Sequence, residues 1–259
     1  MKNKEILIVP DVHGRDFWKV VKEYPNSPIV FLGDYVAPYE DYDGISKREA
    51  IEMFKEVLKF RKENPERVTL LLGNHDASYI IGADMCRNRI DYENYDEIRK
   101  LFWDKDNEFQ FTLAKEINGK KFLFSHAGYT KDWIKCANEI FLTEDLDKIF
   151  SDWQFINRMD KTHSYLLYKN LKKFSFYRDG YDLSGSLIWA DVQEHIKTDV
   201  EIETDWIQIF AHTYCKLPLH GKSEYEWYML DCKEVFYIDQ DGIVRYLKDD
   251  KEIEMIKIN

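Results

Sequence analysis

The 259-residue sequence has little cysteine, glycine or proline and no long apolar run. Its four cysteines are scattered without a C-x-x-C pair, which argues against a disulfide framework and against a zinc ribbon. The apolar run near the N-terminus is stopped by Pro10, too early for a signal peptide. No stretch approaches the roughly 20 apolar residues of a membrane-spanning helix. We therefore expect a cytoplasmic protein with reduced cysteines and no membrane partner.

Basic charge is also scarce, because 37 lysines and arginines face 48 aspartates and glutamates and leave a net charge of −11. Long nucleic acids and anionic membrane surfaces attract clustered positive charge, so neither is expected as a partner. A chain that is 44% hydrophobic and 33% charged is typical of a globular protein. We expect a single domain over residues 1–259, and the sequence leaves its oligomeric state open.

Three early apolar runs each end in a turn that carries polar residues. They cover residues 5–9, 28–32 and 67–72. Short continuous apolar runs of this kind indicate strands that are buried on both faces. The segments between them have helical patterns, and Ser46 and Glu49 have the spacing of a capping box. Alternating strands and helices predict parallel βαβ units, which gather the polar turns at one edge of a sheet.

The later part of the chain predicts further strands and two helical regions. Asn118-Gly119 between alternating segments indicates a hairpin, and another apolar run ends at His212. The C-terminal tail looks like an antiparallel meander, which favours a mixed second sheet over one purely parallel sheet. The patterns of residues 79–108 and 129–183 indicate mainly helical segments rich in aromatic residues. We interpret them as insertions that form a lid or rim, with plain helical layers on the sheet as the alternative.

The polar residues at five predicted strand ends form a recognisable set. They are Asp11, His13, Asp34, Asn74, His75, His126 and His212. A single histidine at a strand end is usually an ordinary loop residue. Carboxylate, imidazole and carboxamide groups together at equivalent ends of successive strands match the ligands of two adjacent divalent metals that share one carboxylate.

The ordered motifs DVHG, GDYV, GNHD, SHAG and AHT resemble those of the calcineurin-like metallophosphoesterases. The likeness is greatest to the branch of the phosphoprotein phosphatases and symmetrical diadenosine tetraphosphatases, whose stretch before the last histidine is similar to GSLIWADV here. The resemblance is confined to these short motifs, which lie between Asp11 and Thr213. It implies an α/β fold, a two-sheet β sandwich flanked by helices in four layers, with the helical insertions as a lid or rim.

The resemblance also implies roles for the residues in these motifs. Six would bind two divalent ions, with Asp34 bridging both: Asp11, His13, Asp34, Asn74, His126 and His212. His75 would protonate the leaving oxygen while a metal-bridging hydroxide attacks phosphorus in line. We expect manganese first, with iron and zinc as alternatives, since all three suit nitrogen and oxygen ligands.

Two residues depart from the pattern of that branch. Ala37 stands where an aspartate would orient the acid histidine, and Pro38 stands where an arginine would hold the phosphate. Candidate replacements for the aspartate are Asp76, Asp41 and Asp43. Candidate replacements for the arginine are Arg15, next to the first motif, and Arg178 or Arg158. Ordinary surface charges and ion pairs are the alternative interpretation of each.

We therefore expect a metal-dependent phosphatase that hydrolyses phosphomonoesters or phosphoanhydrides. Its substrate would be a phosphoprotein, a nucleotide or a dinucleoside polyphosphate. A catalytically weak metal-binding module that acts through partner binding is one alternative, prompted by Ala37 and Pro38. A phosphodiesterase is another, although His212 is followed by Thr213 and Tyr214 and so lacks the second histidine of a G-H-x-H motif.

Overall fold

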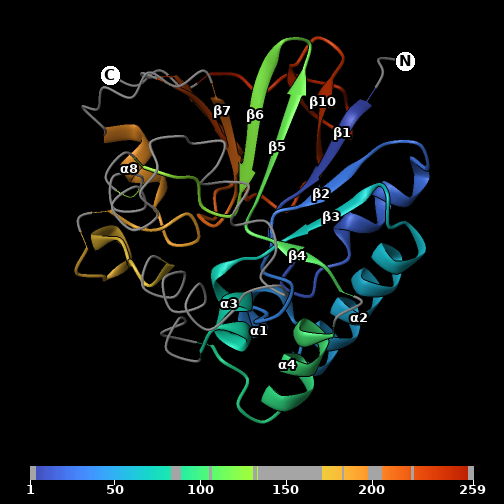
Figure 1. Ribbon diagram of the computed structural model, residues 1–259, viewed down its shortest axis with the longest axis vertical. Helices are drawn as coiled ribbons and strands as arrows, with labels where there is room; N and C mark the ends of the chain where they lie inside the picture. Colours follow the sequence, from blue (N-terminus) through green and yellow to red (C-terminus); the bar gives the residue numbers. More distant parts are fainter. Residues whose placement is uncertain are drawn as a thin grey trace.

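Two mixed β-sheets pack face to face and helices lie outside them (Figure 1). The computed structural model describes residues 4–82, 89–104, 107–130, 133, 171–182, 184–197, 206–222 and 225–255. The six-stranded sheet has the order β11 (Val244–Tyr246), β10 (Phe236–Asp239), β1 (Lys4–Val9), β2 (Ile29–Phe31), β3 (Val68–Leu71), β4 (Phe109–Gln110). The five-stranded sheet has the order β5 (Thr112–Ile117), β6 (Lys120–Ser125), β7 (Trp206–Phe210), β9 (Glu226–Met229), β8 (Leu219–Lys222).

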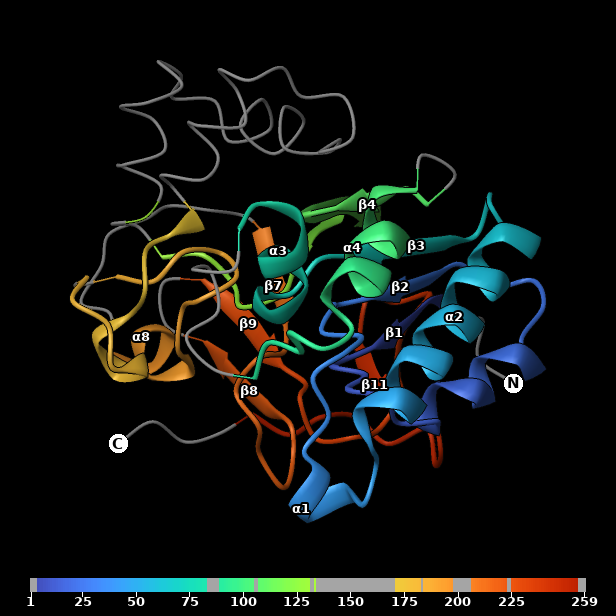
Figure 2. The ribbon, with the colours of Figure 1, turned by 90° about the horizontal axis from the view of Figure 1, so that it is seen from below.

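The helices in the described part of the chain lie on both outer sides of this sandwich and at the ends of its strands (Figure 2). They are η1 (Phe17–Glu23), α1 (Glu40–Asp43), α2 (Lys47–Glu63), α3 (Asn74–Ile80), α4 (Tyr95–Trp103), η4 (Phe176–Arg178) and α8 (Val192–Lys197). Seen from below, α2 and α4 lie on one side and α8 lies on the opposite side, with the strands between them (Figure 2). None of the helices in the described part of the chain combines the length and the apolar character needed to cross a bilayer.

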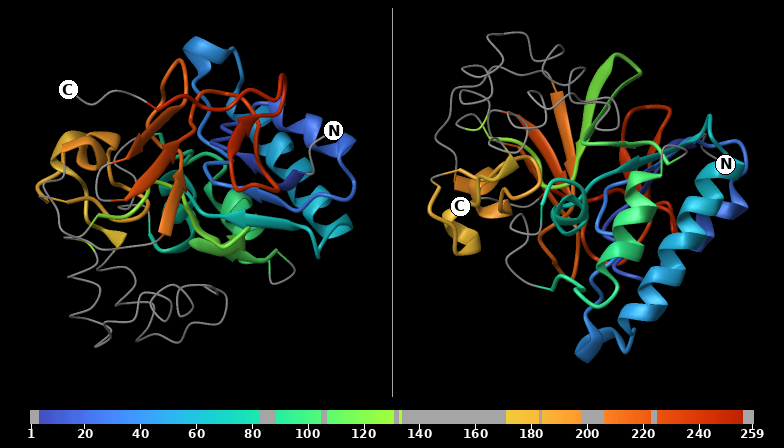
Figure 3. Two further views of the ribbon diagram at one scale, coloured as in Figure 1. Left: turned by 90° about the horizontal axis from the view of Figure 1, so that it is seen from above. Right: turned by 60° about the horizontal axis from the view of Figure 1, so that its bottom comes forward.

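The apolar core confirms the predicted four layers. Alternate residues of β1 face opposite ways: Leu7 packs with residues of α2, whereas Ile8 packs with residues of the second sheet. A third cluster joins α8 to the second sheet through Val192 and Trp227. The order is therefore helix, sheet, sheet, helix, which two further views of the ribbon also show (Figure 3). A strand buried on both faces can be apolar throughout, which explains the continuous runs in the sequence.

The predicted βαβ units are present at the N-terminus. β1 pairs with β2 and β2 pairs with β3, both in parallel. The hairpin at Asn118-Gly119 is also confirmed: β5 and β6 are antiparallel, and both turn residues have positive φ, as a type I′ turn requires. The strand that precedes it is divided, because β4 pairs with β3 in the first sheet before the chain enters the second.

The prediction of one antiparallel meander for the tail is wrong. β8 and β9 form a hairpin in the second sheet, whereas β10 and β11 form a hairpin at the free edge of β1 in the first. β9 also pairs with β7 in parallel. Each hairpin completes a different sheet, because both sheets have an edge that is open to a further strand. The second sheet is mixed, as expected.

The segment after the first motif forms a 3₁₀ helix, η1, instead of a regular α-helix. No side chain caps its N-terminus, and its buried residues, Trp18 and Val21, are three positions apart. Residues with that spacing share one face of a 3₁₀ helix, so both can enter the core while the helix stays short.

The predicted helical insertions are described only in part. Within residues 79–108, α4 packs on α2, with the rings of Phe102 and Phe54 4.7 Å apart, so this portion is a plain helical layer. Within residues 129–183, the described portion comprises residues 129–130, 133 and 171–182, including η4. The remainder of that prediction, Arg158 included, lies outside the described residues.

The predicted capping box of α2 is present. Ser46 accepts from the backbone N–H of Glu49, and the Glu49 carboxylate accepts from the backbone N–H of Ser46. We expect Ser46→Ala to lower the free energy of unfolding by about 1 kcal/mol, because the backbone N–H of Glu49 loses the side-chain oxygen that caps it. Urea unfolding measures this, and Ser46→Thr, which keeps the hydroxyl, is the control. An equal loss in both variants would contradict the capping explanation.

Candidate metal centre

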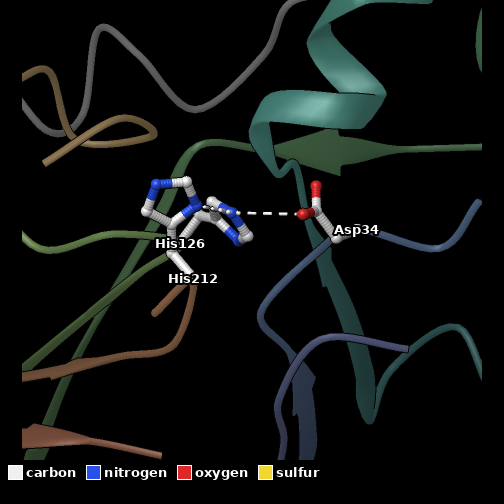
Figure 4. Close-up of side chains that lie close together, drawn as sticks. All are labelled: Asp34, His126 and His212. Atoms are coloured by element: carbon white, nitrogen blue, oxygen red, sulfur yellow. Dashed lines mark hydrogen bonds and ion pairs between the residues drawn. The ribbon is translucent and has the colours of Figure 1, made fainter. Parts of the chain in front are cut away.

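Loops from both sheets converge at the carboxyl ends of their parallel strands. Asp11 and His13 follow β1, and Asp34 follows β2. From the second sheet, His126 follows β6 and His212 follows β7. Figure 4 shows the Asp34 carboxylate opposite the two imidazoles, which come from different strands. The structure therefore brings together residues that lie as much as 201 positions apart in the sequence, as in the hydrogen bond from the His212 backbone N–H to Asp11.

Several of these residues have left-handed backbone conformations. His13, Asp34 and His212 have φ values of 46°, 53° and 69°. A residue with a Cβ pays about 1 kcal/mol or more to adopt this conformation, so neighbouring contacts must hold it. The His13 N–H donates to the Asp34 carbonyl at 2.7 Å, which ties the first loop to the second. Backbone strain is thus concentrated where the polar side chains meet.

The glycines before Asp34 and Asn74 allow these two loops to touch. Gly33 has a φ of 112°, and a Cβ added there would collide with the backbone of Gly73. A Cβ added at Gly73 would collide with the Asp34 carboxylate. Only glycine permits this approach, which places Asp34 against the start of α3.

Asp76 links the same two loops through hydrogen bonds. Its buried carboxylate accepts from the backbone N–H groups of Asp34 at 2.6 Å, Tyr35 at 3.1 Å and Gly73 at 2.9 Å. Burial raises the pKa of Asp76, and these three donors oppose that rise by stabilising the ionised form. Asp76 therefore positions the Asp34 backbone, and it does not take the role of the missing aspartate at position 37.

The first group of candidate ligands is Asp11, His13 and Asp34, whose ligand atoms lie within 4.8 Å of one another. The Nδ1 of His13 lies 3.0 Å from the carbonyl oxygen of Val36 and donates to it. Its Nε2 then carries a lone pair, which faces Asp11 at 3.7 Å and Asp34 at 3.6 Å. A lone pair opposite two carboxylates is repulsive unless a cation lies among them.

The second group is Asp34, His126 and His212, with ligand atoms again within 4.8 Å. His126 donates from Nδ1 to the Leu32 carbonyl at 2.9 Å, so its Nε2 lone pair faces the centre. That nitrogen is 3.5 Å from the Asp34 carboxylate and 2.9 Å from the Asn74 side-chain oxygen. The Nε2 of His212 is buried with no hydrogen-bond partner. Asp34 belongs to both groups.

Burial shifts the titration of the whole cluster towards its uncharged forms. It lowers the pKa of His126 to about 3 and holds the pKa values of His13 and His212 well below their usual range. It raises the pKa of Asp34, and the neighbouring Asp76 carboxylate adds to that rise. Burial and the neighbouring arginines thus keep the three imidazoles neutral, and a neutral imidazole has a lone pair for a cation.

The donor set fits divalent transition metals. Neutral imidazoles with fixed tautomers, ionisable carboxylates and a carboxamide are the ligands that manganese, iron and zinc accept. The backbone carbonyls behind His13 and His126 orient the rings, as the outer partners of metal-bound histidines do. The residues present therefore fit two divalent ions on either side of Asp34.

His75 lies beside these groups at the start of α3. Its ring is 5.6 Å from the ring of His13, and its backbone N–H donates to Asp34 at 3.0 Å. The Nε2 of His75 is 3.0 Å from a guanidinium nitrogen of Arg89. Because a guanidinium can only donate, His75 accepts through Nε2 in this arrangement.

The structure separates the two candidate phosphate-binding arginines. A cavity of about 440 Å³ is lined by His13, Asp34, Tyr39, Asn74, His75, Arg89, Arg178, Asp179, Trp189 and His212. Arg178 is thus at the cavity, where it pairs with Asp191 at 2.7 Å. Arg15 does not line it: its guanidinium pairs with Asp43 at 2.7 Å, and Lys233 pairs with the same carboxylate at 2.6 Å. Asp43 is accordingly engaged away from His75.

Two residues at the centre lie outside the motifs of the sequence. Arg89 has no motif around it, and no sequence signal would have found it. Asp231 directly follows the strand-like segment YMLD, so its position at a strand end was a usable signal. Its buried carboxylate contributes to the raised pKa of Asp11, after burial itself. Asp231 therefore adds a further negative group next to the candidate ligands.

Comparison with known proteins agrees with this arrangement. Residues 4–216 match the family model described as calcineurin-like phosphoesterase. No curated protein matches the chain. Among solved structures, the chain is similar to a cold-active protein tyrosine phosphatase, with a TM-score of 0.53 and 17% identity over 94% of this chain and 78% of the other. At that identity the likeness concerns the fold alone.

Two weaker similarities are to structures of other phosphoesterases. One is a protein serine/threonine phosphatase from Saccharomyces cerevisiae, with a TM-score of 0.45 and 14% identity over 97% of this chain and 81% of the other. The other is YfcE, a phosphoesterase from E. coli, with a TM-score of 0.43 and 12% identity over 98% and 99%. The family match does not depend on them. Because that match covers most of the sequence, the chain belongs to the calcineurin-like phosphoesterase family.

Proposed function

We propose that this protein is a phosphatase that uses two divalent metal ions to hydrolyse phosphomonoesters or phosphoanhydrides. The observation that carries the proposal is the pair of ligand groups, Asp11–His13–Asp34 and Asp34–His126–His212, which share one carboxylate. Asn74 would complete the second group. When bound, such ions lower the pKa of coordinated water and neutralise charge on phosphoryl oxygens. Manganese is the ion we propose first, with iron and zinc as alternatives.

The substrate would be a phosphorylated small molecule or a phosphoprotein. The cavity beside the ligands has two guanidinium groups, Arg89 and Arg178, which suit the negative charge of a phosphoryl group. The net charge of −11 argues against long nucleic acids. We place the protein in the phosphoprotein phosphatase and diadenosine tetraphosphatase branch, because Tyr214 stands where many other members carry the second histidine of a G-H-x-H motif.

His75 would protonate the leaving oxygen in this reaction. Two observations indicate that its help is modest: Ala37 supplies no carboxylate to orient the ring, and Arg89 occupies its Nε2. Leaving groups that depart readily need less protonation. We therefore expect phenolic esters to be hydrolysed much faster than alkyl esters.

The test compares four substrates with metal-stripped protein before and after addition of Mn²⁺: an aryl phosphate, a phosphopeptide, diadenosine tetraphosphate and a bis-aryl phosphodiester. Activity that requires Mn²⁺ supports the proposal, and the order of the rates identifies the substrate class. Preference for the diester would replace the phosphatase with a phosphodiesterase. Bound Mn²⁺ without turnover of any of the four would leave the protein as a metal-binding module.

Metal binding should also stabilise the fold, independently of turnover. A ligand at about 100 times its Kd stabilises the folded state by about 2.7 kcal/mol, which raises the Tm of a chain of this size by several degrees. Differential scanning calorimetry of metal-stripped protein, with and without Mn²⁺, measures the shift. Mg²⁺ at the same concentration is the control, since it prefers oxygen ligands and should stabilise less. No shift with Mn²⁺, iron or zinc would argue against a metal centre.

A further inference from the structure

Arg89 differs from the other arginines near the centre in the way its charge is balanced. Arg15 pairs with Asp43, and Arg178 pairs with Asp191. Among the described residues, no carboxylate lies within ion-pairing distance of Arg89. Its Nη1 is buried and has no hydrogen-bond partner. A buried donor of this kind is costly, and it indicates a place where a ligand is expected.

The two contacts that Arg89 makes at the centre are with uncharged rings. One nitrogen donates to the Nε2 of His75 at 3.0 Å, and the guanidinium carbon lies 3.7 Å above the ring of Tyr39. Both partners are uncharged, so neither competes with an anion for the guanidinium. A phosphoryl group, by contrast, accepts two parallel N–H bonds from arginine.

The backbone of Arg89 is in a strained conformation, and its side chain lies between two cavities. Its φ is 68°, in the left-handed region, as at His13, Asp34 and His212. A residue with a Cβ adopts this conformation at a cost, so its surroundings must hold it. The side chain, with Tyr39, lines both the 440 Å³ cavity of the metal centre and a neighbouring cavity of about 380 Å³. Arg89 therefore lies at the boundary between the candidate ligands and the space beyond them.

We propose that Arg89 is a phosphate-binding residue of this chain, held by Tyr39 and His75 until a phosphoryl group takes over its donors. The exchange would free the Nε2 lone pair of His75 when the substrate is seated, and Nε2 would then take up a proton from solvent before giving it to the leaving oxygen. This inference rests on the proposed function and supplies the cation that is missing at Pro38. It also predicts a preference for monoesters. A terminal phosphate carries two negative charges and should gain more binding energy from Arg89 than a diester, which carries one.

The test uses full-length Mn²⁺-loaded protein and the variants Arg89→Gln, Arg89→Lys and Arg99→Gln. Arg99 is an exposed arginine of α4 outside the cavity and is the matched control. We expect Arg89→Gln to lower kcat/KM for an aryl monoester by roughly 10- to 100-fold, the loss typical of one charged hydrogen bond. The bis-aryl diester should lose far less. Arg89→Lys keeps the charge but not the planar pair of donors, so its kcat/KM for the monoester should lie between the values of the wild type and Arg89→Gln.

Calorimetric titration with inorganic phosphate gives a readout that does not depend on turnover. Arg89→Gln should weaken phosphate binding by roughly tenfold or more, and Arg99→Gln should not. If the wild type hydrolyses nothing, the proposed function fails, and the calorimetric difference alone decides whether Arg89 binds phosphate. If the wild type is active and Arg89→Gln matches it in both kinetics and phosphate affinity, the inference is overturned. Equal losses on monoester and diester would overturn the specificity.

Discussion

Replacement of Asp34 by asparagine should abolish metal-dependent hydrolysis, with a loss of at least about 10³-fold in kcat, equivalent to roughly 4 kcal/mol of barrier. Asp34 is the carboxylate common to both ligand groups, so the change removes one negative charge from each at once. Asparagine has the same shape, and its oxygen can still accept from the His75 backbone N–H. The loss should therefore be electrostatic, with the fold retained.

The measurement is turnover of an aryl phosphate at saturating Mn²⁺, together with the amount of metal that remains bound after gel filtration. Asp96→Asn, an exposed aspartate of α4, is the matched control and should leave both values unchanged. If Asp34→Asn kept a tenth or more of the activity with its metal bound, Asp34 could not be the shared ligand.

Replacement of Asp76 by alanine should give the largest loss of stability among the polar residues of the centre. Its carboxylate satisfies three backbone N–H groups from two loops, all buried. Each buried donor left without a partner costs about 1–3 kcal/mol, so the three together give an expected loss of about 3–9 kcal/mol. Against a typical total of roughly 5–15 kcal/mol, that loss could leave the protein only marginally folded.

Urea unfolding of the metal-stripped protein tests this without the contribution of bound metal. Asp76→Asn keeps one oxygen, which can still accept from Asp34 and Gly73, but its amide faces the Tyr35 N–H. The asparagine variant should therefore lie between the wild type and alanine. A change below about 1 kcal/mol for Asp76→Ala would show that the two loops are held by other means.

The N-terminal half of the fold and the gathering of the polar residues were predictable from local pattern. Apolar runs that end in polar turns indicate strands, and parallel strands place their ends at one edge of a sheet. Those two rules were enough to bring Asp11, His13 and Asp34 together. The hairpin at Asn118-Gly119 and the cap at Ser46 were also predictable, because each depends on neighbours within a few positions.

The features that escaped prediction depend on contacts between distant segments. Asp76 was visible in the GNHD motif, yet its partners include backbone groups more than 40 positions away. Arg15 was well placed by sequence, but it pairs with Asp43, which also pairs with Lys233 at a distance of 190 positions along the chain. Alternation alone likewise cannot assign a strand to a sheet, so the division of the tail between the two sheets was not foreseen.

The two ligand groups differ in what holds them in place. Asp11, His13 and Asp34 all follow strands of one sheet, whose backbone hydrogen bonds fix their relative positions. The second group joins Asp34 to His126 and His212 from the other sheet, across the apolar layer that contains Ile8, Val30 and Phe124. In the proposed enzyme, the second ion would link the two sheets, because its ligands come from both of them. Loosening of the apolar layer far from the centre would then release that ion first and leave the other in place.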